Sequence, residues 1–210
     1  MRVEIINVSH DRPLSFIGEC AGISHGKTDA SVDRALGCWR AGHTSVLEHV
    51  SITFRIEGIS RACSHQLVRH RLASYVQESQ RYTKIDVWHG DWYVIPPTIE
   101  QNEGLCKQYK DHMADAGRAY DKALYHGIKP EDARYLLPEA TKTSVVMTMN
   151  LREFESFYKL RIDKAAQWEI RELARWMLRS LDEIGGEWQT IAGEIHIHAI
   201  KGQADESRRD

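Results

Sequence analysis

The chain has 210 residues, of which 42% are hydrophobic and 28% are charged. This is the composition of a globular protein, and it excludes a collagen-like or wholly disordered chain. The formal net charge of −2 excludes a protein that binds nucleic acid through bulk positive charge.

Compartment and domain number follow from simple features of the chain. No apolar run approaches the roughly 20 residues that a membrane-spanning helix needs, and the first residues lack the pattern of a signal peptide. Because the four cysteines are far apart and form no C-x-x-C pair, we expect free thiols and a cytoplasmic protein. The length favours one domain over two.

The first third of the chain alternates predicted strands and helices. Hydrophobic residues at every second position from Val50 to Ile56 predict a half-buried strand. A helix should begin at Pro13, because proline is favoured at the first helical position. The expected elements are a strand over 2–8, a helix from Pro13, a helix from an N-cap at Thr28 to Gly42, a strand over 50–56 ended by Gly58, and a helix over 59–71.

In the rest of the chain, the sequence pattern predicts mostly helices. Asn150 with Glu153 three residues later resembles a capping box, so a helix should begin at Leu151. The other expected elements are a helix over 105–126, a short helix over 130–138, a strand over 145–150, a helix over 166–184, an apparent strand carrying His196 and His198, and a polar tail over 201–210. Together they predict a single α+β domain over residues 1–200, with helices on a small, mostly antiparallel sheet.

The densest group of polar residues lies at residues 69–82, where three arginines, a histidine, two serines and two glutamines occur. Arginine binds phosphate in bidentate fashion, so this segment favours a phosphorylated ligand. Two alternatives remain open. The segment can be a solvated surface loop, or an RNA-binding patch with Tyr75 and Tyr82 as stacking platforms.

This segment resembles the signature of the flavin-dependent thymidylate synthases, which has R-H-R, then S after two residues, then S-x-R-Y. The matching residues are Arg69, His70, Arg71, Ser74, Ser79, Arg81 and Tyr82. Further segments resemble the family in the same order, over most of the chain except about the last 25 residues. They are Gly42–His49, Ile59–Arg61, Gln66–Val68, Arg134–Pro138, Asn150–Arg152, Leu160–Arg161 and Ala166–Ile170.

The resemblance implies a reaction and its partners. Family members convert dUMP to dTMP with methylenetetrahydrofolate as carbon donor and FAD, reduced by NADPH, as hydride carrier. They are homotetramers with shared sites, and no membrane or nucleic-acid partner is expected. The unrelated cysteine-dependent enzymes use a thiolate in a Pro-Cys-His context, and none of the four cysteines here (Cys20, Cys38, Cys63 and Cys106) follows a proline.

The resemblance also assigns roles to residues. Arg161 is the expected catalytic residue, a fixed cation against the uracil carbonyls, and His43 is expected near the folate and substrate entry. The expected dUMP ligands are Gln66, Leu67, Val68, Arg69, Gln77, Glu78, Ser79, Gln80, Arg81, Arg134 and Arg161, with Arg134 reaching in from a neighbouring subunit. The expected FAD ligands are Ser45, Arg69, His70, Arg71, Gln77, Asn150, Leu151, Arg152 and Ser156. No metal site is expected.

Helical spacing adds two expectations. Gln66 and Arg69 are three residues apart, so both can face one ligand from a helix. Arg152 and Arg161 are nine apart, about half a turn out of phase, so one unbroken helix can serve flavin and dUMP on opposite sides.

Four positions depart from the family pattern. They are Val76 and Gln77, where Asn and Glu are typical, Ser156, where Asn is common, and Ala165, where many members have His. The smaller side chains predict weaker flavin contacts. Two other functions stay open: NADPH oxidation through FAD with poor methylation, and an RNA- or nucleotide-binding module without flavin.

Overall fold

The computed structural model describes residues 1–89 and 91–206, which form two compact units interleaved along the sequence. The larger unit comprises Arg2–Ile56, Arg69–Tyr75 and Val146–Asp210, and the smaller comprises Met1, Glu57–Val68 and Val76–Val145. The expected boundaries, one domain over 1–200 and a flexible tail over 201–210, stay predictions.

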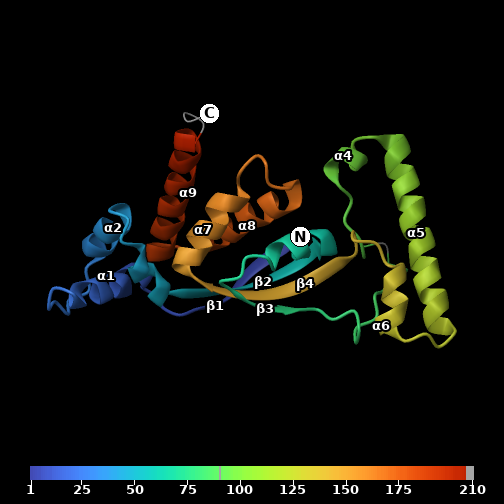
Figure 1. Cartoon of the computed structure of the whole chain (residues 1–210), viewed down its shortest axis with the longest axis horizontal. Coiled ribbons are helices and arrows are strands. Elements are labelled where there is room, and N and C mark those ends of the chain that lie inside the picture. Colours follow the sequence, from blue (N-terminus) through green and yellow to red (C-terminus); the bar gives the residue numbers. More distant parts are fainter. Residues whose placement is uncertain (90, 207–210) are drawn as a thin grey trace. The chain divides into compact units, whose positions relative to one another are not determined.

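The described strands form one sheet in the order β1 (Arg2–Val8), β2 (Ser51–Ser60), β4 (Lys142–Asn150) and β3 (Ser74–Gln77) (Figure 1). The Leu151 amide donates to the Val50 carbonyl over 2.8 Å, and the Thr53 and Thr148 hydroxyls lie 3.0 Å apart, so β2 and β4 are antiparallel. Glu4 lies beside Arg55, and the Ser9 amide donates to Ser51, so β1 and β2 are antiparallel too. The predicted mostly antiparallel sheet is confirmed.

Helices of the larger unit pack on one another and on β1. They are α1 (Pro13–Ile23), α2 (Val32–Arg40), the 3-10 helix η1 (Thr44–His49), α7 (Leu151–Arg161), α8 (Trp168–Ile184) and α9 (Gly186–Glu206). In α8, Ile170, Leu173, Ala174, Met177 and Leu181 are fully buried at helical spacing, and the helix packs against α9 and β1. Gly185 and Gly186 have φ angles of 81° and 58°, a conformation that glycine adopts without strain, and Gly185 separates α8 from α9, which begins at Gly186.

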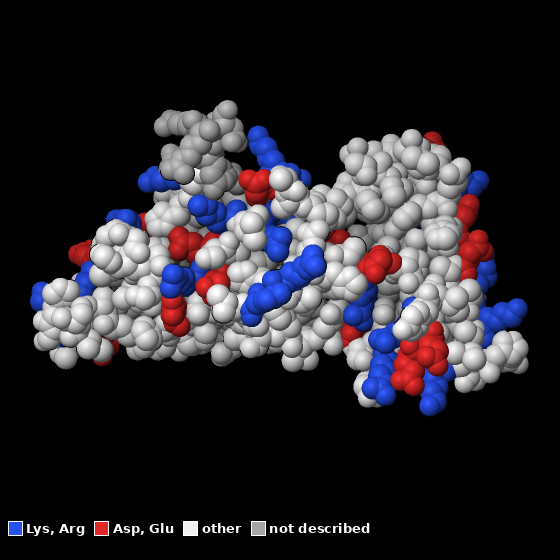
Figure 2. All heavy atoms as spheres, viewed as in Figure 1, with Lys and Arg blue, Asp and Glu red and all other residues white. Residues whose placement is uncertain are grey.

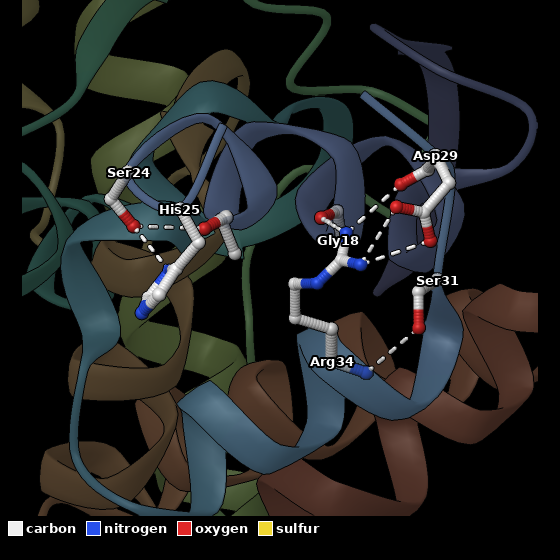
Figure 3. Close-up of polar contacts among 7 residues, drawn as sticks. Gly18, Ser24, His25, Asp29, Ser31 and Arg34 are labelled. Atoms are coloured by element: carbon white, nitrogen blue, oxygen red, sulfur yellow. Dashed lines mark hydrogen bonds and ion pairs between the residues drawn. The ribbon is translucent and has the colours of Figure 1, made fainter. Parts of the chain in front are cut away.

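Arg34 fixes the connection between α1 and α2 (Figure 3). Its guanidinium binds both Asp29 carboxylate oxygens and the carbonyls of Asp29 and Gly18, each over 2.9 Å. The Ser31 hydroxyl accepts the Arg34 amide as the N-cap of α2. The backbones approach so closely that a Cβ at Gly18 would lie 1.9 Å from the Ser31 carbonyl oxygen. Only glycine fits there.

The smaller unit is organised around the long helix α5 (Glu103–Tyr125), which packs against α4 (Pro97–Glu100), α6 (Pro130–Ala133) and the 3-10 helix η2 (Arg134–Leu136). Met113 and Tyr120 of α5 are buried. The unit also contains α3 (Arg61–Leu67), whose N-cap Ser60 accepts the Cys63 amide over 2.9 Å.

Three predicted elements were wrong. The N-cap of α2 is Ser31, not Thr28, because Ser31 is the residue whose hydroxyl meets the Arg34 amide. The strand does not end at Gly58: Gly58 takes a left-handed conformation within β2, which continues to Ser60, so the expected helix over 59–71 is reduced to Arg61–Leu67. The apparent strand at His196 and His198 lies in α9, which continues to Glu206.

Other expectations are confirmed. The Asn150 side chain caps α7 by accepting the Glu153 amide over 2.9 Å, and all four cysteines are free. Among the described residues, no helix is long and apolar enough to cross a membrane. Figure 2 shows acidic and basic side chains interspersed over the face in view, in agreement with the small net charge.

Candidate functional site

The smaller unit contains a hollow of about 460 Å³, here called the arginine hollow. It is lined by Arg61, His65, Gln80, Arg134, Tyr135, Leu137, Pro138 and Glu139. Of the predicted dUMP ligands, it therefore brings together Gln80 and Arg134 within one chain. Whether Arg134 serves the nucleotide of a neighbouring subunit stays a prediction.

Backbone pairing positions the walls of the arginine hollow. The amides of Arg61 and Ala62 donate to the carbonyls of Thr141 and Glu139 over 3.0 and 3.1 Å, which holds the start of α3 beside the start of β4. The Arg134 Nε donates to the Glu131 carbonyl over 3.0 Å, which fixes the arginine at the junction of α6 and η2.

The charge of this hollow is predominantly positive. Burial lowers the pKa of the Arg61 guanidinium, and the nearby charge of Arg134 lowers it further, against the opposing effects of Glu78 and Glu139. The Arg61 Nη2 donates to the Glu78 carbonyl over 2.9 Å, whereas its buried Nε has no hydrogen-bond partner among the described residues. The hollow thus suits an anionic group.

The segment after β3 is held by contacts within the smaller unit. The side-chain amide of Gln77 donates to the hydroxyls of Ser64 and Thr143 over 2.9 and 3.3 Å. The Ser79 hydroxyl accepts the Arg81 amide at 3.3 Å, and the Arg81 guanidinium binds Glu131 over 2.6 Å. Gln77 and Arg81 therefore have protein partners. A ligand that binds these two side chains would share them with those partners or displace the partners.

Gln66, Leu67 and Val68 lie at the end of α3. Leu67 is fully buried, and Val68 is the C-cap. Because the helix ends at Leu67, Arg69 is not on the same helical face as Gln66, and that spacing argument was wrong. Arg69 and Arg71 are exposed and lie in the larger unit.

Four polar residues of the larger unit form what we call the His70 cluster: His70, Tyr75, Glu153 and Arg161. The His70 Nε2 lies 3.3 Å from the Glu153 carboxylate, without the geometry of a hydrogen bond. Burial lowers the pKa of His70. The Glu153 carboxylate opposes this shift by raising the pKa, and the nearby charge of Arg161 lowers it further. Burial raises the pKa of Tyr75 to about 12, and the nearby Arg161 charge opposes the shift. At neutral pH the cluster combines a neutral imidazole with a fixed cation.

Helix α7 is unbroken from Leu151 to Arg161, as expected if one helix serves flavin and dUMP on opposite sides, and that double role stays a prediction. Arg152 and Ser156 face a second hollow of about 460 Å³, here called the α7 hollow, and the Ser156 hydroxyl donates to the Arg152 carbonyl over 3.1 Å. Arg152 also binds Glu48. The lining of the α7 hollow is Trp39, Arg40, Gly42, Thr44, Arg152, Glu155, Ser156, Lys159, His198, Ala199 and Lys201.

Several predicted ligands have other surroundings. Leu151 is fully buried and its amide is bonded to the Val50 carbonyl. The Asn150 side chain accepts the Glu153 amide as a helix cap. Ser45 is exposed in η1, beside Thr44 of the α7 hollow, and His43 is exposed and makes no side-chain cap.

Sequence reasoning missed three polar features. Arg61 was noted only as part of a matching segment, and Glu153 only as a helix-cap residue. His198, which was interpreted as half of a surface pair, binds Glu155 over 2.6 Å in the α7 hollow, while His196 bonds to Tyr158. No local sequence signal reports these contacts, because each joins segments distant in the chain, although the Ser60 cap would have placed Arg61 on the first turn of α3.

The chain is an α+β protein with two arginine-containing hollows that suit anionic small molecules. Comparison with known proteins narrows this class. The family model described as "Thymidylate synthase complementing protein" matches residues 6–184. The flavin-dependent thymidylate synthase of Pyrococcus furiosus is 46% identical over 196 residues, which cover 86% of this chain and 79% of that protein. That of Thermococcus kodakarensis is 50% identical over 198 residues, with coverages of 86% and 78%.

The chain belongs to the flavin-dependent thymidylate synthase family and is an enzyme of that kind. A solved structure, the flavin-dependent thymidylate synthase ThyX of Helicobacter pylori complexed with FAD and dUMP, has a TM-score of 0.70 at 25% identity and covers 93% of this chain and 99% of its own. The UMP/dUMP methylase PolB of Streptomyces cacaoi, bound with 5-Br dUMP, has a TM-score of 0.78 at 23% identity, which supports the fold alone.

Proposed function

We propose that this enzyme methylates dUMP to dTMP in thymidylate biosynthesis, with methylenetetrahydrofolate as carbon donor and FAD as the hydride carrier that NADPH reduces. The methylene carbon requires one hydride to become a methyl group, and the uracil C5 gives up its proton when the carbon–carbon bond forms. The family membership supports this reaction, as does the relative from Helicobacter pylori that is complexed with FAD and dUMP.

The observation that carries the proposal is the arginine hollow. dUMP differs from its nucleoside by a phosphate, and guanidinium groups are the side chains best suited to bind it. Gln80 and Arg134 line the hollow, and Ser79 and Arg81 lie in the same turn. We assign the phosphate to this hollow.

Arg161 is the proposed catalytic residue. It is the last residue of α7, its Nε atom is buried, and its charge acts on His70 and Tyr75. A fixed cation at the uracil carbonyls stabilises the negative charge that develops when N3 ionises, which makes C5 more nucleophilic. Because Arg161 is partly withdrawn from water, this stabilisation is stronger than at the surface.

The donors on α7 fit a flavin cofactor. FAD supplies the hydride when it is bound. Arg152 and Ser156 face the α7 hollow, where Arg40, Lys159 and Lys201 add positive charge that suits a pyrophosphate. The remaining proposed ligands are Ser45, Arg69, His70, Arg71, Gln77, Asn150 and Leu151. His43 is proposed at the folate and substrate entry.

Three finer points belong to the same proposal. The enzyme works as a homotetramer with sites shared between subunits, because a chain of this size without a dinucleotide fingerprint must gather the donors for FAD from several copies. It acts in the cytoplasm. Since Ser156 and Ala165 are smaller than the residues common in the family, FAD is held less tightly than in members with those residues.

A second candidate is FAD-dependent NADPH oxidation with poor methylation. It is favoured by the hydrogen bonds from the side-chain amide of Gln77 to Ser64 and Thr143. The family pattern that this sequence resembles typically has a carboxylate at this position. This candidate keeps the flavin chemistry and loses a contact to the nucleotide.

The experiment that tests the proposal measures dTMP formation from dUMP, methylenetetrahydrofolate and NADPH, with and without added FAD. The visible spectrum of the purified protein reports flavin that it retains. We expect product that requires FAD, either added or retained. A folded, flavin-loaded protein that oxidises NADPH without product would favour the second candidate, and one without either activity would contradict both.

A further inference from the structure

The smaller unit also contains a hollow that the proposed function leaves unused, here called the tryptophan hollow. Its volume is about 280 Å³, and its walls include Trp88, Trp92, Tyr93, Lys110, Ala114 and Arg118. Three of these side chains are aromatic and two are cationic, and among the described residues the lining contains no carboxylate or side-chain amide. Because aromatic faces stack on flat rings and cations bind anions, the hollow suits a flat ring that carries an anionic group.

Helix α5 forms the cationic wall of the tryptophan hollow. Lys110, Ala114 and Arg118 follow one another at intervals of four residues, so they lie along one face of the helix. At a rise of 1.5 Å per residue, the Cα atoms of Lys110 and Arg118 are about 12 Å apart along the helix axis. The small side chain of Ala114 therefore leaves space for a ring between two positive charges.

The aromatic wall is held in place by the fold. A Cβ at Gly117 of α5 would lie 3.0 Å from the Val87 Cβ and 3.2 Å from the Trp92 Cζ2, so the helix backbone packs directly against this wall. Trp92 is only 6% exposed, and its carbonyl accepts the Lys142 amide over 2.8 Å. Its ring meets that of Tyr93 edge-on at 5.1 Å between centroids. A ligand would thus meet a wall that is already formed, which lowers the entropic cost of binding.

Two groups of the hollow have no partner within the part of the chain that the structure describes. The Trp88 side chain is 65% exposed and makes no aromatic or cation–π contact there, and Lys110 makes no ion pair there. The acids of the neighbouring loop are already bonded, Asp86 to His89 and Asp91 to Lys142. An exposed tryptophan and a lysine without a carboxylate partner thus line one hollow.

We infer that the tryptophan hollow binds a purine nucleotide, with the base on the aromatic wall and the phosphate at Lys110 and Arg118. The exposed ion pair of Arg118 with Asp115 contributes little, so a phosphate replaces it readily. Because no amide or carboxylate side chain in the described lining reads the edge of the base, recognition rests on stacking and favours the larger purine ring. The volume lies just below the roughly 300–1,000 Å³ of sites for drug-sized ligands, which fits one nucleotide.

Two sources supply this chemistry. One is a free purine nucleotide, and the other is the adenosine phosphate half of NADPH, the reductant of the proposed reaction. Both present an adenine or related ring with phosphate groups. Only the second source rests on the proposed function.

The test titrates AMP by calorimetry into the full chain saturated with FAD and dUMP, so that the nucleotide sites of the proposed function are filled. AMP should bind, and UMP, adenosine and inorganic phosphate should each bind at least about fivefold more weakly. Trp88→Ala should weaken AMP about 5- to 100-fold, and Lys110→Met about 3- to 10-fold. The controls are Trp176→Ala on α8 and Lys122→Met on α5, two partly or fully exposed residues outside the hollow, and both should match the wild type within twofold.

Ala114→Leu keeps both cations and all the rings but fills the space between them. Leucine is a good helix former and residue 114 is exposed, so the variant should fold. It should weaken AMP more than about 20-fold, whereas Ala119→Leu, at an exposed position of α5 outside the hollow, should not change the affinity. AMP affinity that survives both Trp88→Ala and Ala114→Leu overturns the inference.

The KM for NADPH separates the two sources. A KM that rises in Trp88→Ala by the factor that AMP affinity falls supports the site for the adenosine half of NADPH, and an unchanged KM with lost AMP binding supports it for free purine nucleotides. Absence of AMP binding in a protein that makes dTMP overturns the inference while the proposed function stands. Trp88-dependent AMP binding in a protein that makes no dTMP supports the inference and contradicts the proposed function.

Discussion

The imidazole Nε2 of His70 lies 3.3 Å from the Glu153 carboxylate, and only 11% and 16% of the two side chains are exposed. The ring of His70 meets Phe157 edge-on with the centroids 5.6 Å apart, and its carbonyl accepts the Tyr75 hydroxyl over 2.7 Å. Residues of α7 thus set the orientation of a histidine that the family signature assigns to flavin.

Replacing Glu153 by Gln should lower the pKa of His70 further, because Glu153 opposes the effect of burial. With its folded-state pKa below the unfolded value near 6.5, His70 contributes stability that is complete above that pH and is lost as the pH falls. The melting temperature of Glu153→Gln should therefore fall more steeply than that of the wild type between pH 7.5 and 5.5.

Proton NMR titration of the His70 ring checks the direction of this shift. Glu172→Gln is the control, because Glu172 is an exposed acid of α8 that pairs with Arg175. A His70 pKa that stays unchanged or rises in Glu153→Gln would contradict the conclusion that Glu153 raises the pKa of His70.

Replacing Arg161 by Ala should lower kcat for dTMP formation about 100- to 1000-fold, the usual loss when one group that stabilises transition-state charge is removed. FAD affinity should stay within about twofold. Arg161→Lys keeps the charge but not the planar geometry and should retain part of the activity. Arg175→Ala on α8 is the control. Near-normal turnover in Arg161→Ala would show that Arg161 is not the catalytic residue.

Gly18→Ala should destabilise the fold by about 1–3 kcal/mol, because the new Cβ would lie 1.9 Å from the Ser31 carbonyl oxygen and the α1–α2 pair would have to move (Figure 3). Gly37→Ala is a matched control within α2, where a Cβ meets nothing within 4 Å. It should stabilise the fold by about 0.5–1 kcal/mol. Urea unfolding measures both, and equal effects of the two substitutions would contradict the close approach.

Ser156→Asn should tighten FAD binding about two- to tenfold, the range expected for one added hydrogen bond, because the longer amide reaches further into the α7 hollow. Ser180→Asn is the control, since Ser180 also donates to the carbonyl four residues earlier but lies on α8. Flavin fluorescence titration gives both affinities. If Ser156→Asn leaves FAD affinity unchanged, residue 156 is not a determinant of flavin binding.

Local signals predicted much of this fold. The Asn150 cap, the alternation in β2 and β4 and the apolar stripe of α8 depend on neighbours in sequence, and each was predicted correctly. Helix α9 was missed because its apolar residues alternate around His196 and His198, whose partners, Tyr158 and Glu155, lie on α7. Arg61 was missed for a similar reason: its place beside Arg134 depends on the pairing of β2 with β4 and on the fold of residues 130–139, neither of which a local pattern reports.

The most direct test of the proposed reaction counts NADPH consumed and dTMP formed in the same reaction with saturating FAD, dUMP and methylenetetrahydrofolate. One hydride is needed to reduce the transferred methylene to a methyl group, so the account predicts one dTMP for each NADPH oxidised. Sustained NADPH oxidation without a matching amount of dTMP would contradict it.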